Sequence, residues 1–268
     1  MPVVTSDANE TGAQRRAATR AATRARILAS ARDLIPGAEA TLPVTAIAKH
    51  AGVAIQTIYD QFGSKGGLLI AVINDVQRSI GLFEAFRGVF TAPDGEAAMR
   101  RMIEATVSFW DRAWPYLEFV LRTRRLDKVV AREMDFIDRL RHAHFWAITR
   151  RLEDEGRLRT GLTAESAADR FFALTIPTIY EELVVVRRAS AGDAIEAVIA
   201  AVGGAIIEPG SLVAPIGPPD WAALEREAAV RAKERGADHA RLSPDWLGTA
   251  GPSGIEQAGP RRAARPRA

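Results

Sequence analysis

The chain has 268 residues, of which 47% are apolar and 26% are charged, and it contains no cysteine. This length and composition are typical of a globular protein with a buried core, and they exclude disulfides, thiolate metal ligands and a catalytic thiol. The formal net charge is only +3, but it is unevenly distributed. Residues 1–32 and 261–268 each carry a charge of +4, whereas residues 33–260 carry −5. Two basic ends on an acidic body indicate a polyanionic partner.

Residues 1–30 are polar and contain arginines, without the apolar segment of a secretory signal. The longest apolar stretches, 68–73 and 197–207, are too short to span a bilayer. We therefore expect a cytoplasmic protein that does not bind a membrane. Because the chain has only four histidines besides lacking cysteine, we expect no metal site, and we expect no cofactor.

Apolar residues recur at helical spacing along nearly the whole chain, which predicts an all-α fold. In the first such segment one helical face carries Ile27, Leu28, Ala31, Leu34 and Ile35. Arg16, Arg20 and Arg24 form a basic stripe on the same helix. Further helices are expected at about 44–50, 54–61, 66–89, 94–112, 115–124, 127–155, 164–188, 193–206 and 219–235.

Helix boundaries are expected at glycine, proline and capping residues. Asp94, Thr163 and either Gly192 or Asp193 are the expected N-caps. Pro177 should kink or split its helix after Thr175 or Ile176. Beyond residue 208 the chain becomes rich in proline and glycine, which predicts disorder from Gly248 onward.

Residues 44–69 carry the strongest signal, with the sequence VTAIAKHAGVAIQTIYDQFGSKGGLL. Ala51 is small enough for close helix approach, Gly52 can adopt a positive φ, and Val53 can fill the angle between two helices. Two short helices joined by such a turn form a helix-turn-helix. The stretch resembles the DNA-binding segment of the TetR family of bacterial transcriptional regulators. The resemblance covers residues 20–73 and is carried by Ile47-Ala48, Ala51-Gly52-Val53, Thr57-Ile58-Tyr59, Phe62, Ser64-Lys65 and Leu68-Leu69.

The sequence departs from the family pattern at four places. Pro43 and Ala54 replace side-chain caps, Gln61 replaces a polar aromatic residue, and Gly66-Gly67 replaces a charged pair. These departures affect the operator sequence and local stability rather than the motif itself.

The resemblance implies specific contacts with double-stranded DNA. Ile55 and Gln56 would face base edges in the major groove, where glutamine can pair with adenine and isoleucine can touch a thymine methyl group. Phosphate contacts would come from Thr57, Tyr59, Gln61 and Lys65. Arg16 and Arg20 would lie near phosphates or the minor groove, although such a stripe can also be an ordinary solvated face. The basic C-terminal tail is better explained by solubility than by DNA contact.

The resemblance also implies an order of parts along the chain. A basic disordered arm (1–19) and the DNA-binding domain (20–74) would precede a helical regulatory and dimerisation domain (75–208). An extension with a short helix and a disordered end (209–268) would follow. The family dimerises through its last two long helices, here 164–188 and 193–206. We therefore expect a homodimer, although a monomeric core could also bury the apolar second helix.

A regulatory domain of this kind would bind a small-molecule effector in an apolar pocket between helices. From the aromatic residues in the middle of the chain we select Trp110, Phe145 and Tyr180 as ligand-binding candidates. His142 and His144 point in different directions on a helix, so we interpret them as surface or pocket-rim residues rather than a zinc pair.

Enzymatic motifs are absent from the sequence. Residues 63–67 resemble a phosphate-binding loop, but the spacing GxxxxGK[ST] is missing, as are GxSxG, HExxH and GxGxxG. We expect no catalytic residues. The function predicted is a ligand-responsive regulator that acts as a repressor on a palindromic operator. The alternatives are an activator, a helix-turn-helix regulator without a ligand and, more remotely, a helical enzyme that binds a small molecule.

Overall fold

The computed structural model describes residues 12–38, 42–210 and 217–236. Within these ranges every regular element is helical, apart from one antiparallel bridge between Leu158 and Ile207. This confirms the predicted all-α fold. The elements in chain order are α1 (Gly12–Leu34), η1 (Ile35–Gly37), α2 (Val44–Ala51), α3 (Ile55–Phe62), α4 (Lys65–Ser79), α5 (Leu82–Val89), α6 (Gly95–Arg124), α7 (Lys128–Asp154), α8 (Ala164–Ala173), α9 (Pro177–Tyr180), the π-helix η2 (Glu181–Val186), α10 (Ala191–Ile206) and α11 (Trp221–Glu234).

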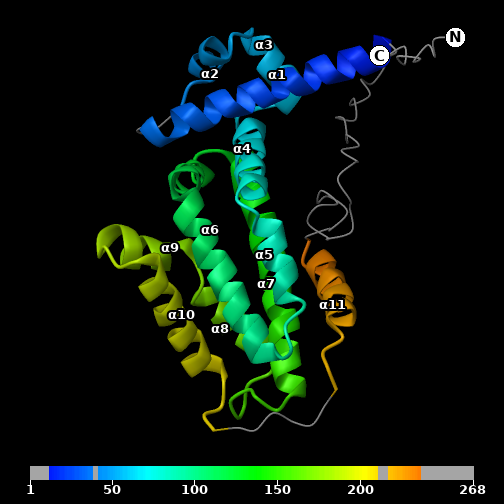
Figure 1. Cartoon of the computed structure of the whole chain (residues 1–268), viewed down its shortest axis with the longest axis vertical. Coiled ribbons are helices and arrows are strands. Elements are labelled where there is room, and N and C mark those ends of the chain that lie inside the picture. The colour runs from blue at the N-terminus through cyan, green and yellow to red at the C-terminus, as the bar shows by residue number, and fades with distance from the viewer. Residues whose placement is uncertain (1–11, 39–41, 211–216, 237–268) are drawn as a thin grey trace, which may run out of the picture.

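Two parts of the molecule share one helix. Figure 1 shows α1 lying across the top of the molecule beside α2 and α3, while α4 leads down into a bundle of longer helices. We call α1 to α3 with the start of α4 the head, and the helices from α5 to α10 the body. The domain boundary expected between residues 74 and 75 falls inside α4. Head and body are therefore joined by a continuous helix.

The head has its own apolar core. Ile27 of α1, Ile47 of α2 and Ile58 of α3 are almost completely buried. An ion pair of 2.8 Å between Arg32 Nη1 and Asp75 Oδ2 then ties α1 to α4. Because α1, α2 and α3 each bury one face here, the opposite faces of α1 and α3 remain available to solvent.

Residues 12–19 are helical, which corrects the expectation of a disordered arm over this stretch. Their sequence, GAQRRAAT, is rich in alanine and arginine, and both residue types favour a helix. The helix already formed by residues 20–34 therefore extends toward the N-terminus. Residues 1–11 lie outside the described part of the chain, as do the predicted disordered end from Gly248 and the basic tail at 261–268.

α6 corrects a second expectation, because it runs without interruption through Pro115. We expected separate helices at 94–112 and 115–124. Proline removes one backbone hydrogen bond, but Trp114 before it and Leu117 and Phe119 after it are all buried. Packing on both sides of Pro115 outweighs the lost bond and keeps the two segments in one helix.

The predicted helix at 66–89 is instead divided into α4 and α5. Gly81, with a φ of 72°, lies between them in a left-handed conformation that favours glycine. The predicted helix at 164–188 is also divided. α8 ends at Ala173 and α9 begins at Pro177, so the break lies where the proline predicted it.

The predicted N-caps are confirmed at two helices and corrected at one. Asp94 and Thr163 cap α6 and α8, and Ser166 completes a reciprocal capping box with Thr163. The N-cap of α10 is Ser190, not Gly192 or Asp193. Asp193 is the third helical residue, and its Oδ2 accepts a hydrogen bond from Ser190 N.

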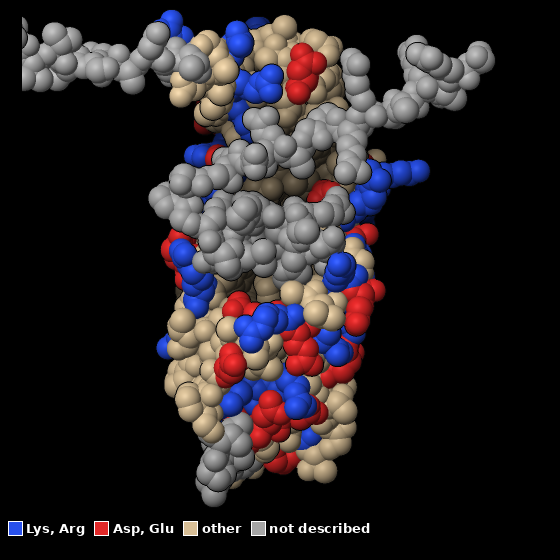
Figure 2. Space-filling model, turned by 90° about the vertical axis from the view of Figure 1, so that its right-hand side faces the viewer, with Lys and Arg blue, Asp and Glu red and all other residues tan. Residues whose placement is uncertain are grey.

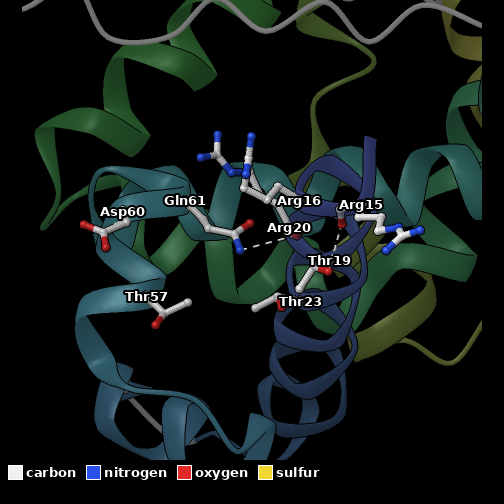
Figure 3. A pocket seen from close by; sticks show the side chains of 8 residues that line it. All are labelled: Arg15, Arg16, Thr19, Arg20, Thr23, Thr57, Asp60 and Gln61. Carbon is white, nitrogen blue, oxygen red and sulfur yellow. Dashed lines mark hydrogen bonds between the residues drawn. The ribbon is translucent and has the colours of Figure 1, made fainter. Parts of the chain in front are cut away.

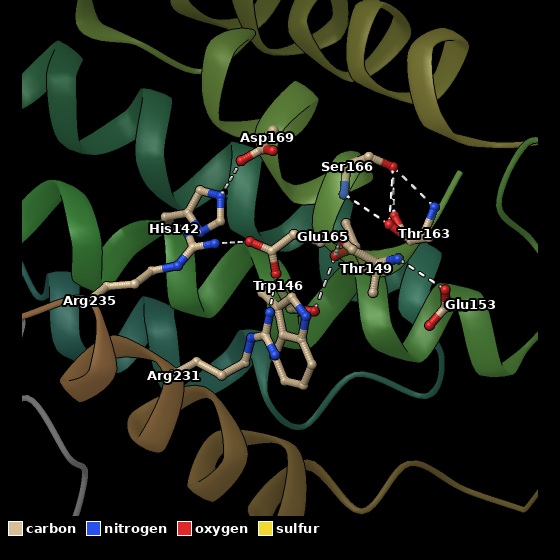
Figure 4. A network of polar contacts seen from close by, with 11 residues as sticks. His142, Trp146, Thr149, Glu153, Thr163, Glu165, Ser166, Asp169, Arg231 and Arg235 are labelled. Carbon is tan, nitrogen blue, oxygen red and sulfur yellow. Dashed lines mark hydrogen bonds and ion pairs between the residues drawn. The ribbon is translucent and has the colours of Figure 1, made fainter. Parts of the chain in front are cut away.

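α11 belongs to the C-terminal extension and packs against α7 of the body. The buried Trp221 donates a hydrogen bond from Nε1 to Ala92 O at 2.8 Å. At the other end of the helix, Arg231 and Arg235 both bind Glu165 of α8, as Figure 4 shows. The extension is therefore attached to the bundle at both ends of α11, through the buried Trp221 at one end and through ion pairs with Glu165 at the other.

None of the helices in the described ranges has the length and apolar character required to cross a membrane.

Candidate nucleic-acid interface

The helix-turn-helix consists of α2, α3 and the short turn between them. Gly52 adopts φ 63° in this turn, Ala51 is buried and Val53 is half-buried. The roles expected of the three turn residues are therefore met by the geometry. Ala54 precedes α3 without a side-chain cap, as its methyl side chain dictates.

One face of α3 is turned outward. Ile55 is 41% exposed and Tyr59 is 40% exposed, although large apolar side chains usually lie inside. Gln56 is exposed beside them, and its Nε2 donates a hydrogen bond of 2.8 Å to Asp60 Oδ1. Ile58, on the neighbouring side of the same helix, is completely buried. Thus the two predicted base-reading residues and Tyr59 share a solvent-facing surface.

The other predicted contacts of α3 face an open groove against α1. The groove has a volume of about 480 Å³, and Figure 3 shows Thr57 and Gln61 on one side with the N-terminal half of α1 on the other. Gln61 Nε2 lies 3.4 Å from Arg20 O, to which it donates a hydrogen bond. The full lining is Arg15, Arg16, Thr19, Arg20, Thr23, Thr57, Asp60 and Gln61.

Arg16 and Arg20 are exposed at this groove and form no ion pair within the described part of the chain. On the face shown in Figure 2, basic and acidic side chains are interleaved over the body, and basic side chains lie at the upper end among uncharged residues and an acidic group. The groove wall formed by α1 is therefore positively charged, with Asp60 as the acidic residue opposite.

Arg24 differs from the other arginines of the basic stripe. Its guanidinium lies 4.3 Å from the centre of the Phe62 ring, and its Nη1 donates a hydrogen bond of 3.2 Å to Gln61 O. Burial is the main cause that lowers the pKa of Arg24. Arg24 therefore holds the end of α3 against α1, a role that spacing along the sequence did not reveal.

Lys65 is half-buried at the first position of α4, where Ser64 caps the helix by accepting a hydrogen bond from Gly67 N at 2.9 Å. The structure explains why glycines follow Lys65 at positions 66 and 67, which the sequence did not reveal. A Cβ on Gly67 would lie 2.2 Å from Phe62 O, and a Cβ on Gly66 would lie 2.9 Å from Val129 Cβ. They allow α4 to approach α3 on one side and the start of α7 on the other.

The body contains a mainly enclosed cavity of about 60 Å³ between α4, α5, α6 and α7. Trp110, one of the three ligand-binding candidates, contributes to its wall, and His144 also lies at the cavity. The full lining is Gln77, Leu82, Phe86, Met102, Thr106, Phe109, Trp110, Ile137, Arg141 and His144.

Phe145 and Tyr180, the other two ligand-binding candidates, do not line this cavity. Phe145 is fully buried and stacks on Phe171 with 4.2 Å between ring centres. Tyr180 donates a hydrogen bond of 2.9 Å to Asp111 Oδ1, and burial together with this bond raises the pKa of the phenol. Both side chains are used in packing.

His142 lies away from the cavity, in the contact between the body and α11. Its Nε2 is 2.8 Å from Asp169 Oδ1 and its Nδ1 is 3.0 Å from Arg235 Nη1. Within the described residues, His142, Glu165 and Asp169 bring three possible metal ligands within 4.8 Å of one another. However, both oxygens of Glu165 are bound by arginines of α11. The cluster therefore acts as an ionic attachment point.

Comparison with known proteins gives a sequence match within the head and structural matches over most of the chain. Residues 27–72 match the family model of bacterial regulatory proteins of the tetR family. No curated protein matched the chain.

Several solved structures share the helical fold. SmeT, the repressor of the Stenotrophomonas maltophilia multidrug efflux pump SmeDEF, matches with 20% identity and a TM-score of 0.54, covering 75% of this chain and 98% of SmeT. A SmeT–triclosan complex has 20% identity and a TM-score of 0.57, with coverage of 74% and 98%. A Saccharomonospora viridis protein in complex with choline has 20% identity and a TM-score of 0.57, with coverage of 70% and 99%. At these identities the similarity shows the fold.

The family match covers the helix-turn-helix whose outward face is described above, and the remaining helices follow the fold of such regulators. The sequence match to the tetR family model covers residues 27–72, which contain the helix-turn-helix, and the similarity of the whole chain to solved regulators is a similarity of fold.

Proposed function

We propose that the protein is a homodimeric repressor that binds a palindromic operator and is released from it by a small molecule. The observation that carries this proposal is the outward face of α3, where Ile55 and Tyr59 are exposed while Ile58 anchors the helix. In a two-fold dimer, two such helices would enter successive major grooves. Ile55 and Gln56 would read bases, while Thr57, Tyr59, Gln61 and Lys65 would contact phosphates together with Arg16 and Arg20.

Dimerisation is supported by the outward side of α10. Its exposed positions include Ala197, Ala200, Ala201 and Gly204, whose small side chains permit close approach of a second helix. Nearby, Val186 at the end of η2 is 62% exposed. We propose that α8 and α10 pair with the same helices of a second copy, which would cover these apolar positions.

Effector release is supported by the position of α4. Gln77 of this helix lines the body cavity, while Gly67 near its other end packs against the last residue of α3. A ligand that favours a different position of α4 would change the spacing of the two recognition helices. The shift in DNA affinity would equal the difference in ligand affinity between the two arrangements. SmeT, which shares this fold, is a repressor and has been solved in complex with triclosan.

The DNA-binding part is tested by selecting operators from random duplex DNA and measuring binding by gel shift. Ile55→Ala should weaken binding and relax base preference, whereas Lys65→Gln should weaken binding of all sequences and reduce its salt dependence. Val230→Ala and Lys233→Gln are matched controls, because both residues are exposed on α11, which packs against α7 of the body.

Loss of binding in the controls to the same degree as in the test variants would contradict the assignment of α3. A selected consensus without two-fold symmetry, or a monomer in sedimentation at micromolar concentration, would contradict the dimer. If binding of the protein to the selected operator increases transcription of a reporter gene, the protein is an activator rather than a repressor. Turnover of a bound small molecule would favour the enzyme alternative.

A further inference from the structure

The body cavity contains polar atoms without partners. In the described ranges, five buried side-chain nitrogen or oxygen atoms have no hydrogen-bond partner, and three of them belong to residues that line this cavity. They are Gln77 Oε1, Thr106 Oγ1 and Arg141 Nε. Gln77 and Thr106 are each only 4% exposed. Buried polar groups are normally hydrogen-bonded, so their concentration around one small space indicates a polar ligand.

Arg141 gives the cavity a positive charge. Its ion pair with Asp138 is long, at 3.6 Å between Arg141 Nη2 and Asp138 Oδ1. The other oxygen of Asp138 lies 2.9 Å from Arg124 Nη1, so this carboxylate is shared between two arginines. Burial lowers the pKa of Arg141, because the charged guanidinium is removed from water. No Asp or Glu lies in the cavity lining. The positive charge of Arg141 is therefore only partly compensated within the protein, and a bound anion would compensate the remainder.

Apart from His144, the remaining wall is apolar and contains three aromatic side chains. Phe86, Phe109 and Trp110 line it together with Leu82, Met102 and Ile137. Arg141 itself is fixed by Phe172 of α8, whose ring centre lies 4.6 Å from the guanidinium carbon. A planar guanidinium held in this way suits a carboxylate, which can accept two parallel hydrogen bonds. The surrounding wall suits a ring.

Resting on the proposed function, we propose that the effector is a small aromatic carboxylate that carries a hydroxyl group. The carboxylate binds Arg141 and accepts a hydrogen bond from Thr106, the ring lies among the aromatic side chains, and the hydroxyl group donates to Gln77. The enclosed space of about 60 Å³ admits only part of such a molecule. Binding therefore requires α5, with the half-buried Phe86, to move away from α6.

The test is calorimetric titration of the full chain with 4-hydroxybenzoate, in the absence of DNA. We expect saturable binding, with much weaker binding of the neutral 4-hydroxybenzamide. Arg141→Gln should weaken binding of the acid by about tenfold or more and abolish the preference for the acid over the amide. Arg139→Gln is the matched control, because Arg139 lies two residues away on α7 but does not line the cavity. Thr106→Val should weaken binding while preserving the shape of the side chain.

Several results would overturn the proposal. Absence of saturable binding by the acid would do so, as would equal binding of acid and amide, or an equal loss in Arg139→Gln. If Arg141→Gln fails to fold, the comparison of Thr106→Val with wild type decides the matter, and unchanged binding in that variant counts against the proposal. Gel shift with the same ligands separates this inference from the proposed function. Binding without DNA release would preserve the site but contradict its role as the effector switch.

Discussion

Arginines near the two ends of the described chain serve different purposes. Arg16 and Arg20 of α1 are exposed at the groove beside α3 and form no ion pair within the described ranges. Arg231 and Arg235 of α11 both bind Glu165, and Arg231 also lies 4.4 Å from the centre of the Trp146 ring. Residue type and position near a chain end are alike in both cases. What differs is whether the fold itself supplies the negative charge.

This difference separates affinity for an outside anion from internal attachment. An arginine without an internal carboxylate remains available for phosphate, and its effect on binding should depend strongly on salt. An arginine already bound to glutamate contributes to folding instead. The comparison therefore predicts that the two groups will respond to different measurements.

The largest expected effect concerns the apolar part of the α11 attachment. Trp221→Ala removes a buried ring that packs 5.8 Å from the Phe90 ring and donates a hydrogen bond to Ala92 O. We expect thermal or denaturant unfolding to show a loss of about 3–5 kcal/mol. Val230→Ala on the same helix should change stability by less than about 0.5 kcal/mol, because Val230 is 57% exposed. Similar losses in both variants would mean that α11 is not docked as described.

Exchanging the two arginine groups for glutamine tests the comparison directly. The pair Arg16→Gln and Arg20→Gln should weaken DNA binding and reduce the salt slope by about 0.9 for each phosphate that is no longer neutralised, without changing the melting temperature. The pair Arg231→Gln and Arg235→Gln should lower the free energy of unfolding by about 1 kcal/mol and leave the salt slope unchanged. Gel shift over a salt series and thermal unfolding measure the two effects. If both double variants reduce the salt slope of DNA binding equally, the arginines of α1 and those that bind Glu165 do not differ in role.

The helix-turn-helix was predictable because its geometry is local. Ile55, Ile58 and Tyr59 lie on one short helix at a spacing that by itself would place all three on one face. It was the resemblance to a known helix-turn-helix, carried by residues close together in the sequence, that indicated DNA-facing roles for Ile55 and Tyr59. The body cavity was not predictable in this way. Gln77, Thr106 and Arg141 come from three different helices, and only the packing of these helices brings them to one space. Phe145 was chosen for its aromatic ring, but the same property allows it to stack on Phe171 in the core.

A smaller effect is expected from pH, through His142 in the α11 attachment. Arginine can only donate hydrogen bonds, so Nδ1 of His142 accepts from Arg235 and Nε2 carries the proton that is donated to Asp169. A second proton would break the contact with Arg235. Burial is the main cause that lowers the pKa of His142, with Arg235 and Arg231 acting in the same direction, although Asp169 opposes them. The folded protein therefore binds this proton less readily than the unfolded chain does.

It follows that the stabilising effect of neutral His142 is complete above the unfolded pKa of about 6.5 and decreases as the pH falls below that value. The protection of α11 amides against hydrogen exchange, taken relative to the intrinsic exchange rate at each pH, should decrease from about pH 7 to pH 5. His142→Gln, whose amide can still donate to Asp169 and accept from Arg235, should reduce this loss of protection. Because the variant keeps His50 and His144, an unchanged pH response would assign the effect to another group.

The smallest effect concerns the acidic residue on the groove itself. Asp60 accepts a hydrogen bond from Gln56 and lines the groove opposite the arginines of α1. A carboxylate here repels phosphates but also orients the glutamine predicted to read bases. Asp60→Asn keeps an oxygen that can accept from Gln56 while removing the charge. Overall affinity should therefore rise by about two- to fivefold, with base preference retained.

Asp33→Asn provides the control, because Asp33 is an exposed carboxylate on α1 outside the groove lining. Gel shift with the selected operator and with a scrambled duplex separates affinity from preference. If Asp60→Asn instead weakens operator binding and leaves scrambled DNA unaffected, the carboxylate itself contacts a base, such as the amino group of cytosine. In that case Asp60 belongs with Ile55 and Gln56 on the reading face of α3, and the positive wall of α1 acts alone in attracting phosphates.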